Sequence, residues 1–378
     1  MGYRALKAVT SGDDNIAIGS YAGDAMTTST YNVAIGQYAL SSVNTGGSNI
    51  GIGRLAGSNI TSANNNIFIG YGAGYSNKTG IENVVIGEES YSQTTGEVNF
   101  RNVTTLGSNA GRYATGSYNT FLGSYAGRGG TTSAPYSSGE YNVAVGYQAL
   151  DAFTTGDRNV AVGPNALNSL TTGYRNISIG DRAGNSITSG HSGVYIGYLA
   201  GYGGNQGSNV AIGSEALFTA NGNSNVAVGY QAGRYTTAND GVWIGVGAGS
   251  TGAGGGQSVL VGHYAGQYMV GSEVTHVGRA AGQYASGSRN TFVGSIAGQG
   301  GTTSAPYSSG QNNTAIGYES LKGFTTGGNN IAIGYQSSVA LTTATMTITM
   351  GYLAGNSITT GGSNIMIGRE AEIGRAHV

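Results

Sequence analysis

The sequence contains no cysteine, only three prolines and few charged residues. Without cysteine, the chain can form neither disulfides nor thiolate zinc sites, and it has no cysteine nucleophile. Charged residues make up 9% of the chain and give a formal net charge of −1. Because no basic run is present, nothing in the sequence predicts binding to nucleic acid. No segment approaches the roughly 18 apolar residues of a membrane helix, so we expect no insertion into a membrane.

The usual signatures of enzymes and metal sites are also missing. The four histidines are scattered without metal-ligand spacing, and the acidic pairs Asp13-Asp14 and Glu88-Glu89 do not recur. Residues 247–252 fit the pattern Gly-x-Gly-x-x-Gly, but the helix that a nucleotide-binding loop needs does not follow. We therefore expect no catalytic residues, no metal and no cofactor.

What the sequence has in abundance is repetition. Residues 142–150 read NVAVGYQAL, and near copies of this phrase occur along the whole chain. Each copy has an apolar triplet closed by glycine, and successive closing glycines lie 16 or 17 residues apart, except for one interval of 20 and two of 23. This spacing gives 21 repeats, which is typical of one structural unit stacked on itself. The closing glycines are residues 19, 36, 53, 70, 87, 107, 123, 146, 163, 180, 197, 213, 229, 245, 262, 278, 294, 317, 334, 351 and 368.

Each repeat has the pattern of a short strand followed by turns. The first and third residues of the triplet are mostly β-branched, and the position three after the glycine is always Ala or Ser. Asn precedes the triplet in 15 of 21 copies, where stacked amides can form a ladder. The pattern predicts an all-β fold, a parallel β-solenoid (β-roll) of about 21 coils of 16–17 residues. At about 4.8 Å per coil, such a stack would be a rod on the order of 100 Å long.

The middle residue of the triplet should point away from its two neighbours. We expect the flanking aliphatic residues to face the inside of the coil and the middle column to face outward. None of the middle residues is charged, and none is Asn or Gln, so this outward column should be covered by other copies of the chain. The largest members of the column are the predicted subunit-interface residues: Phe68, Phe121, Tyr195, Trp243, Leu260, Phe292 and Met366. A bland alternative is that the column is merely small and packs against nothing.

The phrase Asn-Val-Ala-Ile-Gly resembles the head repeats of YadA-type trimeric autotransporter adhesins. The variant with Gly-Tyr-Gln-Ala-Leu and Thr-Thr-Gly resembles repeats of phage tail fibres. This resemblance covers residues 2–368 and implies a left-handed β-roll that assembles as a trimer and binds molecules on a host surface. The chain departs from the adhesin pattern in its slightly longer coils, and no neck, stalk or anchor sequence is recognisable.

Two insertions interrupt the regular spacing. The sequence GGTTSAPYSSG occurs at 129–139 and again at 300–310, an offset of 171 residues that spans ten coils. Each insertion should form a loop, and loops on rigid scaffolds often carry binding residues. The candidate receptor contacts are therefore Pro135, Tyr136, Pro306 and Tyr307. The alternative is that these loops are inherited decorations without a ligand.

We interpret residues 1–371 as one β-roll domain and residues 372–378 as a non-native tail, because EIGRAHV looks like a translated sequencing adapter. The chain also begins in the middle of a repeat, which suggests a piece of a longer fibre.

The sequence as a whole favours a non-catalytic, extracellular fibre or adhesin head that attaches to a cell surface. It would be a phage tail fibre or a bacterial trimeric adhesin, with a surface glycan or protein as partner. A purely structural filament or spacer is the first alternative. An ice-binding solenoid, suggested by the recurrent threonines, is less well supported, because adjacent threonines would point to opposite faces.

Overall fold

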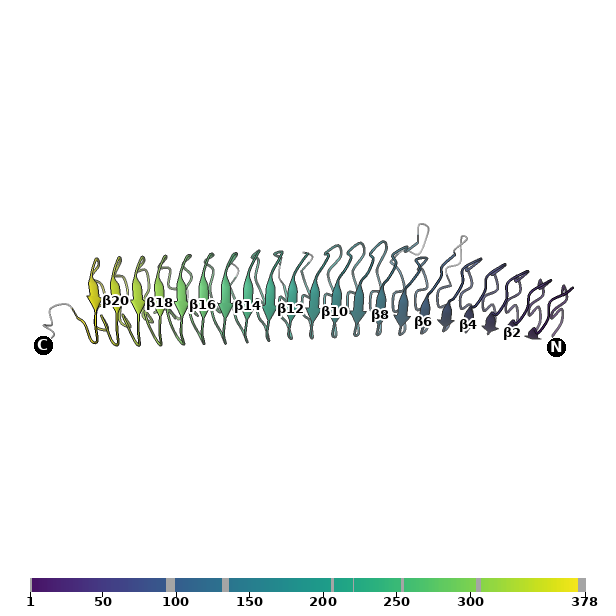
Figure 1. Cartoon of the computed structure of the whole chain (residues 1–378), viewed down its shortest axis with the longest axis horizontal. Helices are drawn as coiled ribbons and strands as arrows, with labels where there is room; N and C mark the ends of the chain where they lie inside the picture. Colours follow the sequence, from purple (N-terminus) through teal and green to yellow (C-terminus); the bar gives the residue numbers. More distant parts are fainter. Residues whose placement is uncertain are drawn as a thin grey trace. The chain divides into compact units, whose positions relative to one another are not determined.

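The computed structural model describes residues 2–92, 99–130, 136–204, 207–219, 221–252, 255–303 and 307–372. It divides into two units, the first ending at Gly193 and the second beginning at Val194. Each unit is a stack of coils with one short strand per coil (Figure 1). Residues 373–378, most of the expected non-native tail, lie outside the described residues.

The strands are each three residues long and coincide with the apolar triplets. The first unit contains β1 (Ile16–Ile18), β2 (Val33–Ile35), β3 (Ile50–Ile52), β4 (Ile67–Ile69), β5 (Val84–Ile86), β6 (Thr104–Leu106), β7 (Thr120–Leu122), β8 (Val143–Val145), β9 (Val160–Val162) and β10 (Ile177–Ile179). The second unit contains β11 (Val194–Ile196), β12 (Val210–Ile212), β13 (Val226–Val228), β14 (Val242–Ile244), β15 (Val259–Val261), β16 (Thr275–Val277), β17 (Thr291–Val293), β18 (Thr314–Ile316), β19 (Ile331–Ile333), β20 (Ile348–Met350) and β21 (Ile365–Ile367).

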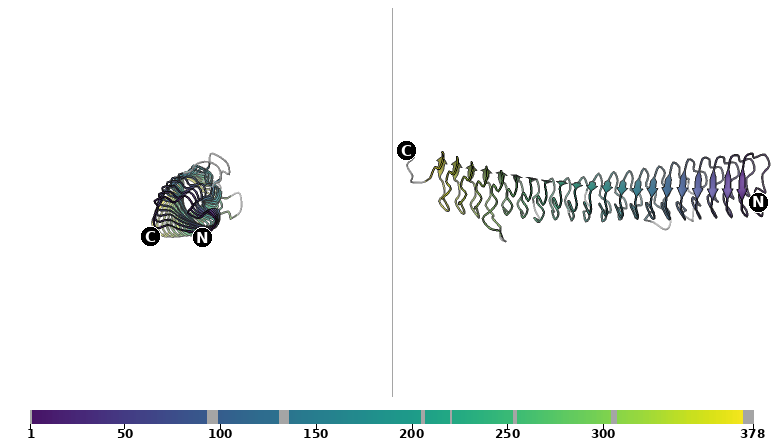
Figure 2. Two further views of the ribbon diagram at one scale, coloured as in Figure 1. Left: turned by 90° about the vertical axis from the view of Figure 1, so that its right-hand side faces the viewer. Right: turned by 90° about the horizontal axis from the view of Figure 1, so that it is seen from below.

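Within each unit, every strand pairs in parallel with the strand of the next coil, and equivalent residues lie opposite each other. Ala17 of β1 faces Ala34 of β2, and Ala211 of β12 faces Ala227 of β13. Figure 2 shows the same ladder of single strands from other directions. The predicted parallel β-solenoid is thus confirmed. Its left-handed sense and its assembly as a trimer stay predictions.

The predicted asparagine ladder is present in both units. The side-chain oxygen of Asn142 accepts hydrogen bonds from the backbone N–H and the side-chain amide of Asn159, at 2.9 and 3.1 Å. The Asn159 side chain in turn donates to the carbonyl oxygen of Gly173, at 2.9 Å. Because these asparagines are buried, each amide satisfies backbone groups that water cannot reach.

The recurrent threonines also connect neighbouring coils. The hydroxyl of Thr154 donates to the carbonyl oxygen of Thr171, and that of Thr171 donates to Thr188, at 3.1 and 2.9 Å. Thr325 and Thr342 make the same kind of bond in the second unit. The threonine repeats therefore have a structural role at the turn.

The glycine that closes each triplet is required by both backbone angle and space. Gly36 has φ of 129°, and a Cβ atom there would lie 2.6 Å from the carbonyl carbon of Gly53 in the next coil. An L-residue would therefore be strained and would also push two coils apart.

The interior of the coil is lined by the middle residue of each triplet, which corrects the expected orientation. In β4 the side chain of Phe68 is fully buried, whereas the flanking Ile67 and Ile69 are only half-buried. All seven predicted interface residues are inside the coil of their own chain, so their side chains cannot form a subunit interface. They are Phe68, Phe121, Tyr195, Trp243, Leu260, Phe292 and Met366. A two-residue period fixes the alternation of side chains but does not say which set faces inward.

Inside the coil, the size of the middle residue is matched by the residue four after the closing glycine. Where the middle residue is aromatic, that position is glycine, and a Cβ at Gly298 would lie 2.5 Å from the ring of Phe292. Where the middle residue is Ala315, the same position holds Leu321, which is also fully buried. The two positions fill one space, because close-packed interiors tolerate neither voids nor overlap.

This complementarity predicts that a paired exchange is better tolerated than either single change. Phe292→Ala should lower the free energy of unfolding by about 3–5 kcal/mol through an empty cavity. Gly298→Leu should clash with the Phe292 ring, which lies 2.5 Å from the position a Cβ would take. The double variant reproduces the Ala315 and Leu321 pair and should recover most of the loss. Thermal unfolding of the four proteins measures this, and strictly additive losses would contradict the shared space.

The asparagine ladder predicts a second stability effect. Asn225 donates to the carbonyl oxygen of Ala238 and accepts from the backbone N–H of Gly241, at 2.7 and 2.9 Å. Asn225→Ala leaves both buried groups without a partner and should lower the free energy of unfolding by about 2–4 kcal/mol. Asn221→Ala, at an exposed turn residue of the preceding coil, is the matched control. Equal midpoints in urea unfolding for the two variants would contradict a stabilising ladder.

Candidate functional site

The outward side of the strands is an aliphatic surface. We call the first and third residues of the strands the aliphatic face. Of its 42 positions, 37 are Ile, Val, Leu or Met and the other five are Thr. The most exposed strand positions between the end coils include Leu106 at 52% and Ile179 at 40%. Among the described strands, no charged residue interrupts this face.

The extent of this apolar face is unusual for a soluble monomeric protein. In the first unit this face continues over ten strands, whereas monomeric soluble proteins usually expose contiguous apolar patches of only a few hundred Å². The aliphatic face, and not the middle column, is therefore the apolar surface that a partner would cover. Residues such as Ile212 and Ile244 are the ones that a covering partner would contact, and sequence reasoning had placed them inside.

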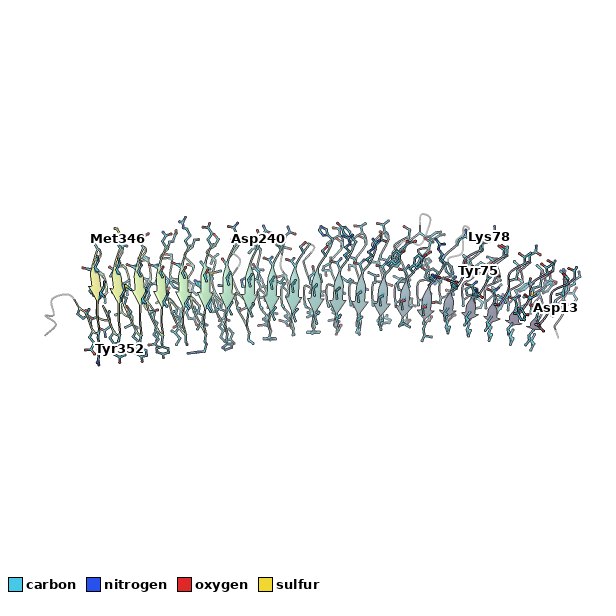
Figure 3. All side chains as sticks on the ribbon, in the orientation of Figure 1. Asp13, Tyr75, Lys78, Asp240, Met346 and Tyr352 are labelled. Carbon is cyan, nitrogen blue, oxygen red and sulfur yellow. The ribbon has the colours of Figure 1, made fainter. Side chains whose placement is uncertain are left out.

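The two ends of the strands carry different side chains. Asp240 and Met346 project where strands of the second unit begin, and Tyr352 projects where they end (Figure 3). At that second edge, Tyr318, Tyr335 and Tyr352 stack on one another with ring centroids 5.3 and 5.2 Å apart. Because these rings cover each other's faces, the row offers mainly ring edges and hydroxyls to solvent.

The residues on either side of the predicted loop tips are bonded to the stack. In the second unit, Gly300 and Gly301 donate backbone hydrogen bonds to the next coil, and Ser308 returns as a parallel bridge partner of Ala285. Ser137 bridges Ala114 in the same way in the first unit. Tyr136 and Tyr307 are half-buried, whereas Pro135 and Pro306 lie outside the described residues.

Tyr307 belongs to a cluster of three tyrosines. Its ring centroid lies 5.3 Å from that of Tyr268 and 6.1 Å from that of Tyr284, and those two rings stack at 5.3 Å. The hydroxyl of Ser286 donates to the carbonyl oxygens of Tyr307 and Ser308, at 3.3 and 3.1 Å. The structure therefore holds the aromatic residue of this loop against the two preceding coils.

A groove of about 550 Å³ opens beside this cluster. We call it the Tyr307 groove, and its lining residues come from four successive coils: Val270, Ser286, Thr302, Tyr307, Ser308, Ser309, Thr325 and Thr326. Val270 is 53% exposed, and Ser309 and Thr326 at the rim are also exposed. None of the eight residues is charged. The groove is thus a neutral recess with hydroxyl groups, methyl groups and one aromatic ring.

The second unit also buries a histidine among the core residues. His276 is fully buried and stacks on Phe292, with ring centroids 4.8 Å apart. Neither ring nitrogen has a hydrogen-bond partner. Burial lowers the pKa of His276 from 6.5 to about 3, because the charged form would lose its hydration. The imidazole is therefore neutral in the folded chain and acts as part of the core.

His276 predicts a loss of stability in acid. Between pH 6.5 and about pH 3 the unfolded chain binds a proton that the folded chain does not bind. The free energy of unfolding should thus be highest above pH 6.5 and fall by up to about 1.4 kcal/mol per pH unit within that window.

His276→Leu should remove this slope and stabilise the fold by about 1–3 kcal/mol at neutral pH, since it removes an unpaired buried N–H group. The preceding coil already has leucine at the equivalent position, where Leu260 lies beside Gly266 as His276 lies beside Gly282. Urea unfolding between pH 4 and pH 7 measures both effects. His263→Gln, at an exposed histidine, is the control and should leave the acid-side loss in place.

In the described part of the chain, no three His, Asp or Glu side chains come together in a way that could hold a metal ion. No helix suited to crossing a membrane is found among the same residues. In comparisons with known proteins, no protein family and no curated protein matches the sequence.

Proposed function

We propose that this protein is a non-catalytic, self-assembling fibre or adhesin head that mediates attachment to a cell surface. It would work outside the cell, in a phage tail fibre or a bacterial trimeric adhesin. The observation that carries this proposal is the aliphatic face. Its apolar side chains need a cover that follows the strands from coil to coil, and the inserted loops offer positions for contact with another surface.

Other copies of the same chain are the partners that best suit the aliphatic face. A stable interface buries about 800 Å² per partner, and the face of each unit extends over ten or eleven strands. A second copy also repeats at the same coil spacing of about 4.8 Å, so rows of aliphatic side chains can interdigitate along many coils. We propose three chains and a left-handed coil, both on the resemblance to YadA-type repeats.

The turns would then form the solvent-exposed surface of the assembly. Tyr136 and Tyr307 lie outside the strands, next to the bridge residues Ser137 and Ser308, so covering the aliphatic face does not require covering these tyrosines. Loops held on a rigid scaffold are suited to recognition, because little entropy is lost when they bind. This arrangement supports attachment rather than a spacer role alone.

A charge introduced into the aliphatic face tests the assembly. Ile212→Glu combined with Ile244→Glu places two carboxylates on neighbouring parts of the face, at positions 38% and 39% exposed in the single chain. We expect wild-type protein at three times the 38.0 kDa chain mass and the variant at the mass of one chain. Light scattering after size exclusion measures this, and circular dichroism checks that the variant keeps its strands.

Asn221→Glu, at an exposed turn of the same coil as Ile212, is the matched control and should leave the oligomer intact. A wild-type protein that runs as one chain would contradict self-assembly. Attachment is measured separately, by binding of the labelled assembly to bacterial and animal cells. An intact oligomer that binds none of them would favour the spacer alternative.

A further inference from the structure

We propose that the Tyr307 groove is a binding site for a neutral oligosaccharide. This inference rests on the proposed attachment function and names the class of ligand that would serve it. It goes beyond the loop itself, because half of the eight groove residues come from neighbouring coils.

The dimensions of the groove suit a short carbohydrate chain. Its volume of about 550 Å³ lies within the range of small-molecule sites. Its residues lie on four successive coils, from Val270 in the coil of β15 to Thr326 in the coil of β18. Three coil spacings give a length of about 14 Å, so the recess is elongated rather than round.

The polar groups of the groove are hydroxyls. A serine or threonine hydroxyl can both donate and accept a hydrogen bond, and each sugar hydroxyl has the same two abilities. Ser309 and Thr326 are exposed at the rim. Thr302 and Ser308 are fixed by a contact of 3.2 Å between their hydroxyl oxygens. Part of the polar lining is therefore held in place before a ligand arrives, which lowers the entropy cost of binding.

The apolar groups of the groove suit the C–H faces of a sugar ring. Tyr307 is half-buried and packs against Tyr268 and Tyr284, so its ring is already ordered. Val270 leaves 53% of its surface exposed beside it. The tyrosine row of Tyr318, Tyr335 and Tyr352 is a weaker candidate, because its ring faces are covered by stacking.

The absence of charge among the eight groove residues selects the ligand class. A sialylated, sulfated or phosphorylated ligand would lose hydration in the groove without gaining an opposite charge there, which costs free energy. A neutral sugar has no charged group whose hydration would be lost. The groove therefore favours uncharged hexoses and N-acetylhexosamines over acidic glycans and acidic peptides.

The first loop provides an internal comparison. At the offset of 171 residues, Tyr136 corresponds to Tyr307 and Ser138 to Ser309, but Asn99 stands in place of Val270. The Asn99 side chain already accepts hydrogen bonds from the backbone N–H and the hydroxyl of Thr79. The exposed apolar wall of the groove is thus replaced by a polar side chain with local partners, so we expect the second loop to be the better binder.

The test is binding of the fluorescent, assembled protein to an array of neutral, sialylated and sulfated oligosaccharides. We expect signals on neutral oligosaccharides, and Tyr307→Ala should weaken them about tenfold through loss of the ring contact. Ser309→Arg should have a similar effect because it fills the groove from an exposed rim position. This second variant keeps the inference testable if Tyr307→Ala disturbs the loop.

Tyr136→Ala and Ser138→Arg are the matched controls in the first loop, and both should bind like the wild type. The backbone N–H of Ser138 donates to Thr154 as that of Ser309 donates to Thr325, each at 2.8 Å, so the two arginine variants make the same local change. The inference is overturned if no neutral oligosaccharide binds, if only acidic ones bind, or if both loops respond equally.

Cell attachment measured in parallel separates this inference from the proposed function. If cells are still bound by Ser309→Arg as by the wild type, the attachment function stands and the groove is not its glycan site. If neutral oligosaccharides bind through the groove but no cell is bound, the groove inference stands and the attachment function fails.

Discussion

The structure depends on a hydrogen-bonded register in which every coil repeats the backbone of the one before. In-register strand pairs such as Ala211 and Ala227 carry part of it, and the asparagine amides carry another part at the corner before each strand. Because a buried amide satisfies groups in two coils, a shift of one residue would leave several buried polar groups unpaired. The uniform coil length follows from this requirement, and extra residues are accepted only at the turns.

The interior is narrow, and this determines which residues face outward. One aromatic or leucine side chain fills much of the space beside a strand, so Phe292 is accompanied by Gly298 and Ala315 by Leu321. The residues at the two ends of each strand, which are mostly Ile and Val, point away from this interior. They form the aliphatic face, and the hydrophobic effect then acts between chains rather than within one chain.

Much of this fold could be predicted from the sequence. The spacing of glycines located every strand, the repeated Asn indicated a ladder, and the invariant Ala or Ser marked a position without space. The orientation of the triplet was predicted wrongly, because alternation alone does not distinguish inside from outside. A signal was nevertheless present: Gly298 accompanies Phe292 while Leu321 accompanies Ala315, and such compensation of size occurs only between residues that share a space.

The Tyr307 groove could not be predicted in the same way. The loop and its tyrosine stand out in the sequence, but the groove also needs Val270, Ser286 and Thr325, which no motif connects. They come together because residues one coil apart in sequence become neighbours in space. A binding site in a solenoid can therefore combine residues from several coils, whereas a sequence motif contains only residues that follow one another along the chain.

The similarity of successive coils has a consequence for how such a protein changes over time. Each coil presents to its neighbours the same upper and lower surfaces, so a block of whole coils can be copied or deleted without creating a new junction. The 171-residue offset between the two loops is the trace of one such copying event. Length can thus evolve in discrete steps by gene duplication, while point changes at the turns, such as Val270 in place of Asn99, let the copies acquire different specificities.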